Sequence, residues 1–161
     1  MIFNADEVLK IAEQIERNGI SFYEKAAERF SGDEKQTLLR LADMERTHEQ
    51  VFAAMRRELS AADQELKALD PEGEAGKYLA AFADGQIFAP KADSTALFSP
   101  ENSARDILET AIGLEKDSVV FYVAIKEAVP AALGEDKINW IIQEEMAHIV
   151  LLSRTLASLD A

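Results

Sequence analysis

Two histidines are present in the sequence, and a glutamate precedes each of them by three positions. The two motifs, Glu45-x-x-His48 and Glu145-x-x-His148, lie 100 residues apart. On an α-helix, residues three positions apart share a face and are separated by about one turn. A carboxylate and an imidazole in that arrangement can bind one metal ion between them, and the remaining carboxylate oxygen can reach a second ion. The paired motif therefore predicts a two-metal site on two helices.

Two further glutamates repeat in the same manner. Glu16 precedes Glu45 by 29 positions, and Glu115 precedes Glu145 by 30. An apolar residue comes before each of these lone glutamates, a basic residue follows it, and a Phe-Tyr pair ends seven positions after it. Such self-similarity indicates the architecture before any local assignment is made. We interpret the chain as two copies of a helical hairpin, in which one helix carries a lone glutamate and the other carries Glu-x-x-His.

The predicted ligands lie on the apolar stripes of their helices, so folding would bury them. Burying one ionised carboxylate costs several kcal/mol unless a partner compensates it, and four converging carboxylates would cost far more. A pair of cations would remove this cost. An isolated Glu-x-x-His is weak evidence for metal, but here both histidines of the chain share the motif. The predicted metal ligands are Glu16, Glu45, His48, Glu115, Glu145 and His148.

Periodicity and capping residues predict the helices that position these side chains. Four long helices are expected, at about 6–29, 33–59, 100–128 and 135–159. The segment from Asn4 to Glu7 resembles a capping box for the first helix. Ser99 before Pro100 suits the N-cap of the third helix, because proline is tolerated in the first turn. Val129-Pro130 is predicted to end it.

The two hairpins are joined by about 40 residues, 60–99. A connection of this length can carry the chain along the whole bundle, so that the third helix runs parallel to the second. Within it, Glu74 to Ala83 is predicted to form a short helix that packs through residues such as Tyr78. Two hairpins and a long crossover predict an all-α, ferritin-like four-helix bundle. The length of 161 residues favours a single domain over 1–161.

The composition argues against several classes of function. The formal net charge of −13 argues against nucleic acid and against an anionic membrane surface as partners. The absence of cysteine excludes disulfides, thiolate zinc sites and iron–sulfur or rubredoxin-type centres. No segment has the length of a membrane span, and the first residues lack the basic and apolar regions of a signal peptide. We therefore expect a soluble, cytoplasmic protein.

Several other side chains near the motifs need an interpretation. Tyr23 and Tyr122 could hydrogen-bond a ligating carboxylate or pass electrons, but a structural role as core tyrosines with satisfied hydroxyls is slightly favoured. Carboxylates beside the motifs but off the apolar stripe are predicted to be solvated: Glu13, Glu49 and Glu144. Methionines near the motifs are predicted to fill the core: Met44, Met55 and Met146.

The six ligand positions and the Phe-Tyr pairs resemble the rubrerythrin branch of the ferritin-like superfamily over nearly the whole chain. The likeness is strongest to short forms that consist of the di-iron domain alone. It implies a cofactor of two iron ions, with manganese as the alternative metal. By this resemblance Glu45 and Glu145 would bridge the metals, Glu16 and Glu115 would be terminal ligands, and each histidine would cap one metal. The implied activity is oxidation of a di-ferrous centre by hydrogen peroxide or dioxygen, followed by re-reduction.

Two departures from the rubrerythrin pattern change these expectations. The chain lacks the four cysteines of a rubredoxin module, so a separate electron donor is expected. Where rubrerythrins have an extra glutamate the chain has Ser118, and its repeat counterpart is Gly19; these small residues are expected to leave coordination positions open for an oxidant. Two alternative functions remain, ferritin-type iron oxidation and handling, and a metal-stabilised helical interaction module. We expect a homo-oligomer, a dimer or larger.

Overall fold

The structure is a computed structural model that describes residues 5–59, 77–78, 81, 98–126 and 131–159. It contains four long helices: α1 (Ala5–Ala27), α2 (Gly32–Glu58), α5 (Ala104–Ile125) and α6 (Ala131–Ser158). No strand occurs among the described residues, and the predicted all-α fold class is confirmed. None of the helices in this part of the chain combines the length and the apolarity that crossing a membrane requires.

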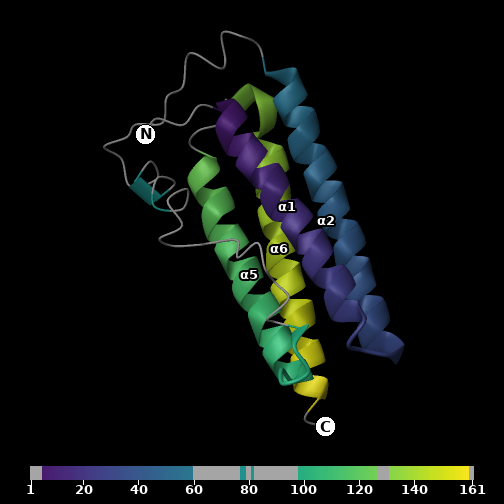
Figure 1. The fold of residues 1–161 in the computed structure, drawn as a ribbon. Helices are drawn as coiled ribbons and strands as arrows, with labels where there is room; N and C mark the ends of the chain where they lie inside the picture. The colour runs from purple at the N-terminus through teal and green to yellow at the C-terminus, as the bar shows by residue number, and fades with distance from the viewer. Residues whose placement is uncertain (1–4, 60–76, 79–80, 82–97, 127–130, 160–161) are drawn as a thin grey trace.

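The helices form two antiparallel hairpins (Figure 1). α1 and α6 run in one direction, and α2 and α5 run in the opposite direction. α2 and α5 are therefore parallel, as the length of the crossover predicts. The helices pack most extensively within each hairpin, α1 on α2 and α5 on α6. The two hairpins meet along α1 and α5 and along α2 and α6, and we call these contacts the α1–α5 seam and the α2–α6 seam.

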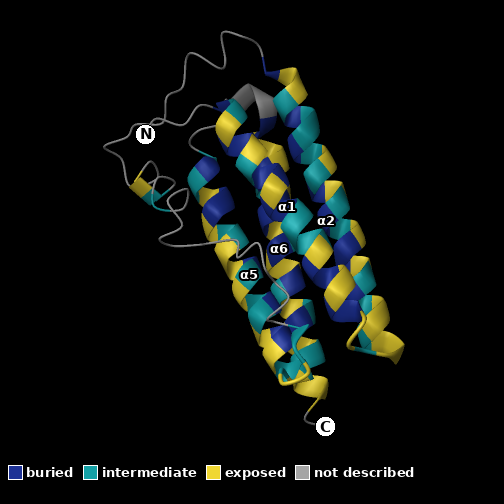
Figure 2. Ribbon diagram, in the orientation of Figure 1, coloured by how far each residue is buried: buried dark blue, intermediate teal, exposed yellow. Residues whose placement is uncertain are grey.

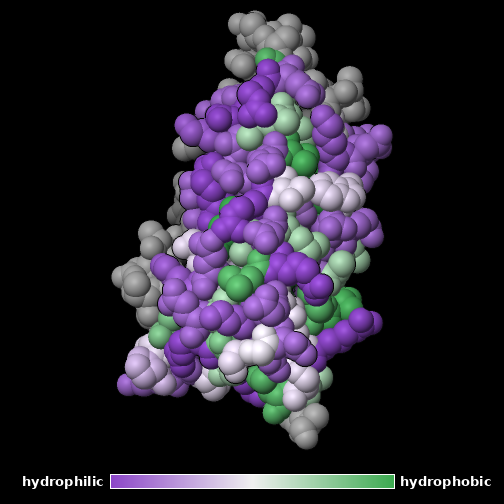
Figure 3. All heavy atoms as spheres, turned by 90° about the vertical axis from the view of Figure 1, so that its right-hand side faces the viewer, coloured by the Kyte–Doolittle hydropathy of each residue, from purple (hydrophilic) through white to green (hydrophobic). Residues whose placement is uncertain are grey.

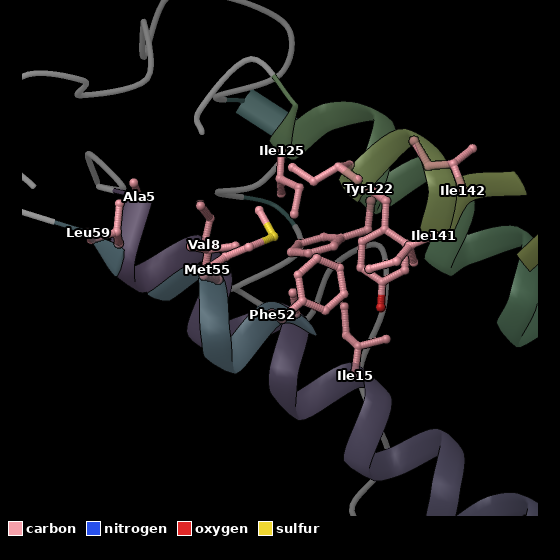
Figure 4. Packing of buried hydrophobic residues seen from close by; sticks show 14 residues of the cluster. Ala5, Val8, Ile15, Phe52, Met55, Leu59, Tyr122, Ile125, Ile141 and Ile142 are labelled. Carbon is pink, nitrogen blue, oxygen red and sulfur yellow. The ribbon is translucent and has the colours of Figure 1, made fainter. Parts of the chain in front are cut away.

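Two apolar clusters fill the bundle, one toward each end. The first includes Phe52, Met55 and Tyr122, whose side chains lie close together in Figure 4; the Phe52 and Tyr122 ring centroids are 5.1 Å apart. The second includes Phe22 and Leu38. Along every helix, the predicted ligands fall between residues of the first cluster and residues of the second. Buried residues thus recur along the whole length of the helices (Figure 2). The six predicted ligands form a polar layer between the two apolar clusters.

The predicted start of α5 is wrong. The helix begins at Ala104 with Ser103 as its N-cap, and not after Ser99. The Ser103 hydroxyl accepts a hydrogen bond from the Asp106 backbone N–H, and the Asp106 carboxylate accepts one from the Ser103 backbone N–H. This reciprocal capping box satisfies two N–H groups at the helix start. Ser99 and Pro100 instead lie in a turn that precedes the helix, where proline is equally well accommodated.

The remaining helix boundaries lie near the predicted ones or fall outside the described residues. α6 has non-helical geometry at Gly134, so its regular part begins close to the predicted residue 135. The predicted cap at Asn4 and the predicted stop at Pro130 lie outside the described residues. Of the short helix predicted over 74–83, residues 77, 78 and 81 are described; all three are helical, and Tyr78 packs against the first apolar cluster.

Two predictions about side-chain exposure are wrong. Glu13 is only 5% exposed, because its Oε1 lies 2.7 Å from the Nε of Arg56 and the pair joins α1 to α2. Met146 is exposed on the outer face of α6, since it directly follows the inward-facing Glu145 and is turned away from it. Among the other glutamates and methionines near the motifs, Met55 is buried as predicted. Met44, Glu49 and Glu144 are partly buried.

The outer surfaces of the two hairpins differ. The face on the α2 side is mainly hydrophilic, with apolar residues in small separate areas (Figure 3). The large apolar side chains that are exposed among the described residues all lie on the second hairpin or directly after it: Val120, Val123, Trp140, Met146, Val150 and Leu159. The two hairpins therefore resemble each other more closely in their buried residues than in their exposed residues.

Candidate metal centre

All six predicted ligands come together in the polar layer between the two apolar clusters. α1 and α5 each contribute one glutamate, and α2 and α6 each contribute a glutamate and a histidine. None of the six residues is more than 4% exposed. The spacing of three within Glu-x-x-His turns both side chains toward the inside of the bundle, so the local sequence explains the placement on each helix.

The six side chains form two groups of atoms that could each hold a metal ion. One group is Glu16, Glu45, His48 and Glu145, and the other is Glu45, Glu115, Glu145 and His148. Within each group the ligating atoms lie within 4.8 Å of one another. Glu45 and Glu145 belong to both groups, and the other four residues belong to one group each.

The two shared carboxylates, those of Glu45 and Glu145, both lie between the two histidines. Glu45 Oε2 lies 3.4 Å from His48 Nδ1, and Glu45 Oε1 lies 3.1 Å from His148 Nδ1. Glu145 Oε1 lies 3.0 Å from His48 Nδ1, and Glu145 Oε2 lies 3.2 Å from His148 Nδ1. Each carboxylate therefore has one oxygen beside each histidine. A carboxylate that bridges two cations needs this arrangement.

The spacing of atoms around each histidine fits ligands that surround an ion. Three carboxylate oxygens lie 3.0–3.6 Å from each Nδ1, yet neither Nδ1 has a hydrogen-bond partner. Metal–ligand bonds of about 2.1 Å would place neighbouring ligand atoms about 3.0 Å apart at right angles and about 3.4 Å apart at the tetrahedral angle. Both oxygens of Glu145 and Oε1 of Glu45 are also buried without a hydrogen-bond partner. Since buried polar atoms require compensation, this set of atoms fits a pair of cations.

Two buried tyrosines contact the glutamates of α1 and α5. Tyr23 on α1 donates a hydrogen bond to Glu115 on α5, and Tyr122 on α5 donates one to Glu16 on α1. Burial, together with the charge of the accepting glutamate, raises the pKa of each tyrosine well above its usual range. The hydroxyls therefore remain protonated donors. The two tyrosines are core residues with satisfied hydroxyls, and they also hydrogen-bond predicted ligands.

Without a bound metal, the four glutamates have different affinities for protons. Burial raises the pKa of Glu16 and Glu115 well above the usual range, and the neighbouring carboxylates of Glu45 and Glu145, respectively, raise it further. Burial acts in the same direction on Glu45 and Glu145. For these two, however, the adjacent terminal glutamate and the two imidazoles stabilise the ionised form and hold the pKa below its usual value. The shared carboxylates therefore lose their protons more readily than the terminal ones.

Both histidines carry a proton in the metal-free site. Burial alone would lower the pKa of a histidine, but the surrounding carboxylates outweigh it and raise the pKa of His48 and of His148 to about 12. Two imidazolium ions then balance the charge of the two shared carboxylates. Two divalent cations would balance all four carboxylates once the ligands had lost their protons.

Of the two small residues near the terminal ligands, Gly19 has surroundings that differ from the prediction. At Gly19 the available space is occupied by Glu45: a Cβ added there would lie 3.3 Å from Glu45 Cγ, closer than ordinary van der Waals contact. The glycine thus allows Glu45 to approach the backbone of α1, and it does not provide an open coordination position. Ser118 is partly buried, and its hydroxyl donates a 3.1 Å hydrogen bond to the Leu114 carbonyl oxygen.

One residue beside the site was not identified from the sequence. Trp140 on α6 packs edge-to-face against His48 on α2, with ring centroids 5.5 Å apart and an interplanar angle of 88°. His48 in turn stacks on His148 at 5.6 Å. The indole is 42% exposed, so it extends from the surface to a buried predicted ligand. Its repeat counterpart on α2 is Arg40, and this break in the repeat, at the only tryptophan of the chain, was the available signal.

The same architecture occurs in a solved structure. A Thermotoga maritima protein described as ferritin-like and diiron-carboxylate superposes with a TM-score of 0.80 and 24% sequence identity, over 98% of this chain and 97% of that chain. No protein-family model matches the sequence, and no curated protein matches it. At this identity the likeness establishes the fold. The chain is a ferritin-like four-helix bundle, as its repeated hairpins predict.

Proposed function

We propose that the chain binds a pair of iron ions in this polar layer and uses them to reduce hydrogen peroxide or dioxygen, as rubrerythrins do. The observation that carries the proposal is that Glu45 and Glu145 each divide their two oxygens between His48 and His148. Oxygen-rich ligation with one imidazole per ion suits iron, and also manganese, better than a metal that prefers thiolates. The description of the similar Thermotoga maritima protein as diiron-carboxylate supports iron.

In this proposal the two groups of atoms each hold one ion. Glu45 and Glu145 would contribute to holding both ions, and each remaining glutamate and histidine would hold the ion of its own group. The terminal pairs are Glu16 with His48 and Glu115 with His148. When bound, two ferrous ions supply one electron each, so that hydrogen peroxide and two protons yield two water molecules.

The chain itself orients the ligands and limits access of water. The tyrosine hydroxyls hydrogen-bond the carboxylates of the terminal ligands Glu16 and Glu115. Hydrogen bonds of this kind orient metal ligands and adjust their basicity. Tyr23 and Tyr122 also keep a proton one hydrogen bond away from the ligand set. The two apolar layers isolate the site from solvent, which strengthens every electrostatic interaction within it.

Turnover in this proposal requires partners. A separate electron donor must return the ions to the ferrous state, because the sequence has no cysteine to hold an iron–sulfur or rubredoxin-type relay. We also propose a cytoplasmic location, where such reductants are maintained. A homo-oligomer, a dimer or larger, is supported by the exposed large apolar side chains of the second hairpin.

Metal analysis followed by rapid mixing tests the proposed function. Protein purified without chelator should contain two iron ions per chain. The ferrous form should be oxidised faster by hydrogen peroxide than by dioxygen, and turnover should require an added reductant. If dioxygen is the faster oxidant and iron accumulates beyond two ions per chain, ferritin-type iron oxidation replaces this function. If iron binds but neither oxidant reacts with it, the chain is better described as a metal-stabilised interaction module.

A further inference from the structure

We propose that Trp140 covers the path by which a metal ion reaches and leaves the buried site, at the α2–α6 seam. The proposal rests on the metal binding proposed above, but it concerns the kinetics of binding and not the reaction. It makes Trp140 a residue that controls exchange of the metal without ligating it.

A path must open before a metal can bind, since every proposed ligand is almost completely buried. Within each hairpin the helices pack extensively on one another, so the two seams between the hairpins are the better candidates for opening. Each seam passes beside the polar layer. The side chains that close the two seams at this level therefore decide which one opens more readily.

The α1–α5 seam is closed by hydrogen bonds between buried groups. Tyr23 is bound to Glu115 across it, and Tyr122 is bound to Glu16. Opening this seam would break both of these buried hydrogen bonds. The two tyrosines thus stabilise the closed α1–α5 seam and also position the proposed ligands Glu16 and Glu115.

The α2–α6 seam is closed beside the site by a ring contact. Trp140 covers His48 edge-to-face, and the indole is 42% exposed. A rotamer change could move a half-exposed side chain into solvent without separating the helices. The movement would uncover the imidazole of a proposed ligand directly. At the position that corresponds to Trp140 in the repeat, α2 has Arg40, an exposed residue without an aromatic ring.

The charge around Trp140 also favours an approaching cation. Asp136 and Glu144 lie four residues before and after Trp140 on α6, so that a carboxylate flanks the indole one turn away on either side. Lys137, which also lies one turn before Trp140, is paired with Glu58. A negative potential at the opening raises the local concentration of divalent cations. The net charge of −13 acts in the same direction over the whole molecule.

Cobalt(II) binding kinetics test this proposal with a readout that is independent of oxidant chemistry. Association is followed by the visible absorbance of bound Co²⁺ after rapid mixing, and dissociation by transfer of Co²⁺ to a chromogenic chelator. The variants are Trp140→Ala, which removes the cover, and Trp140→Phe, which retains a smaller ring. Val150→Ala is the matched control, because Val150 is an exposed apolar residue on the same helix with 50% exposure.

A cover affects both rate constants equally. In Trp140→Ala, association and dissociation should each become about tenfold faster, the scale of one lost aromatic contact, with an unchanged Kd. Trp140→Phe should lie between this variant and the wild type, and Val150→Ala should match the wild type. Unchanged rates in both Trp140 variants would overturn the proposal. Faster dissociation with unchanged association would also overturn it, since Trp140 would then only hold His48 in place. Failure of the wild type to bind Co²⁺ would instead count against the proposed metal site.

Discussion

Tyr122 on α5 and Glu16 on α1 are joined by a buried hydrogen bond that crosses between the two hairpins. Tyr23 and Glu115 make the reciprocal hydrogen bond in the opposite direction. Each hairpin therefore supplies the tyrosine that holds the glutamate of the other. Separating the hairpins would break both of these buried hydrogen bonds. The same contacts therefore join the two hairpins and position the proposed terminal ligands.

Replacing either of these tyrosines with phenylalanine should weaken metal binding while preserving the fold. Tyr23→Phe leaves Glu115 without its donor, and Tyr122→Phe does the same to Glu16. Loss of a hydrogen bond to a metal ligand typically lowers metal affinity by about 10- to 100-fold. Titration calorimetry with Co²⁺ measures the change. Tyr78→Phe is the control, because Tyr78 is the third tyrosine of the chain and lies outside the polar layer. Equal affinities for all three variants would contradict this role.

The bridging and terminal glutamates should differ in the number of metal ions that their variants retain. Glu45→Ala or Glu145→Ala removes an oxygen from both groups of ligand atoms, so neither variant should bind the metal pair. Glu16→Ala or Glu115→Ala removes a ligand from one group only and should mainly weaken one position. Metal content after dialysis against a fixed free-metal concentration distinguishes the two outcomes. An equal loss in all four variants would exclude the bridging assignment.

Metal binding near neutral pH should release at least two protons per chain. Two come from the imidazolium groups of His48 and His148, and any protons held by Glu16 and Glu115, whose carboxyl pKa values are raised, add to them. Calorimetric titration in buffers of different ionisation enthalpy measures this number. Glu16→Gln should release fewer protons than the wild type, because the amide has no proton to lose in this range. Release of one proton or none would show that the ligands are already deprotonated before the metal arrives.

The stability of the metal-free protein should fall as the pH rises above neutrality. The pKa of His48 and of His148 is raised to about 12 in the folded state, whereas an unfolded histidine titrates near about 6.5. The stabilisation is therefore complete below about pH 6.5 and declines as the pH rises toward 12, because only the folded state still holds these protons. Bound metal replaces the protons, so its stabilising effect should grow over the same range. Thermal melts at about pH 6, 7.5 and 9, with and without Mn²⁺, test both trends. A metal-induced shift in Tm that shrinks as the pH rises would contradict the prediction.

Substitution of Gly19 by alanine should separate helix stability from metal affinity. Alanine in the interior of α1 favours the helix by about 1 kcal/mol relative to glycine. Its Cβ would lie 3.3 Å from Glu45 Cγ, however, and would displace that side chain by a few tenths of an ångström. We expect the metal-free protein to be as stable as the wild type or more stable, but with metal affinity reduced several-fold. Gly113→Ala on α5 is the matched control, because no atom lies within 4 Å of an added Cβ there. Chemical denaturation and Co²⁺ titration of both variants provide the comparison, and unchanged Co²⁺ affinity in Gly19→Ala would exclude this role.

The fold and the clustering of six side chains could be predicted from the sequence because both follow from short-range sequence patterns. Helical periodicity orients Glu45 and His48 toward one face, and the repeat applies the same rule to Glu145 and His148. The long crossover then determines the direction of α5. These patterns hold within single helices, so they could be recognised before any tertiary contact was known.

The features that were predicted wrongly or missed depend on contacts between helices or on a choice between two possible capping residues. Burial of Glu13 depends on Arg56 from another helix, and neither residue by itself indicates the pair. The contact of Trp140 with His48 depends on how α2 and α6 are rotated relative to each other. Ser103 and not Ser99 caps α5 because Asp106 completes the reciprocal capping box. Helical periodicity specifies none of these choices.

The position of Trp140 also gives the protein an internal spectroscopic probe. It is the only tryptophan of the chain, so the whole indole emission arises beside one of the two histidines. Paramagnetic ions quench indole emission at short range, whereas closed-shell ions such as Zn²⁺ do not. The emission intensity therefore reports occupancy next to His48 more strongly than occupancy next to His148. A fluorescence titration can follow the order in which the two halves of the centre fill, without an added label.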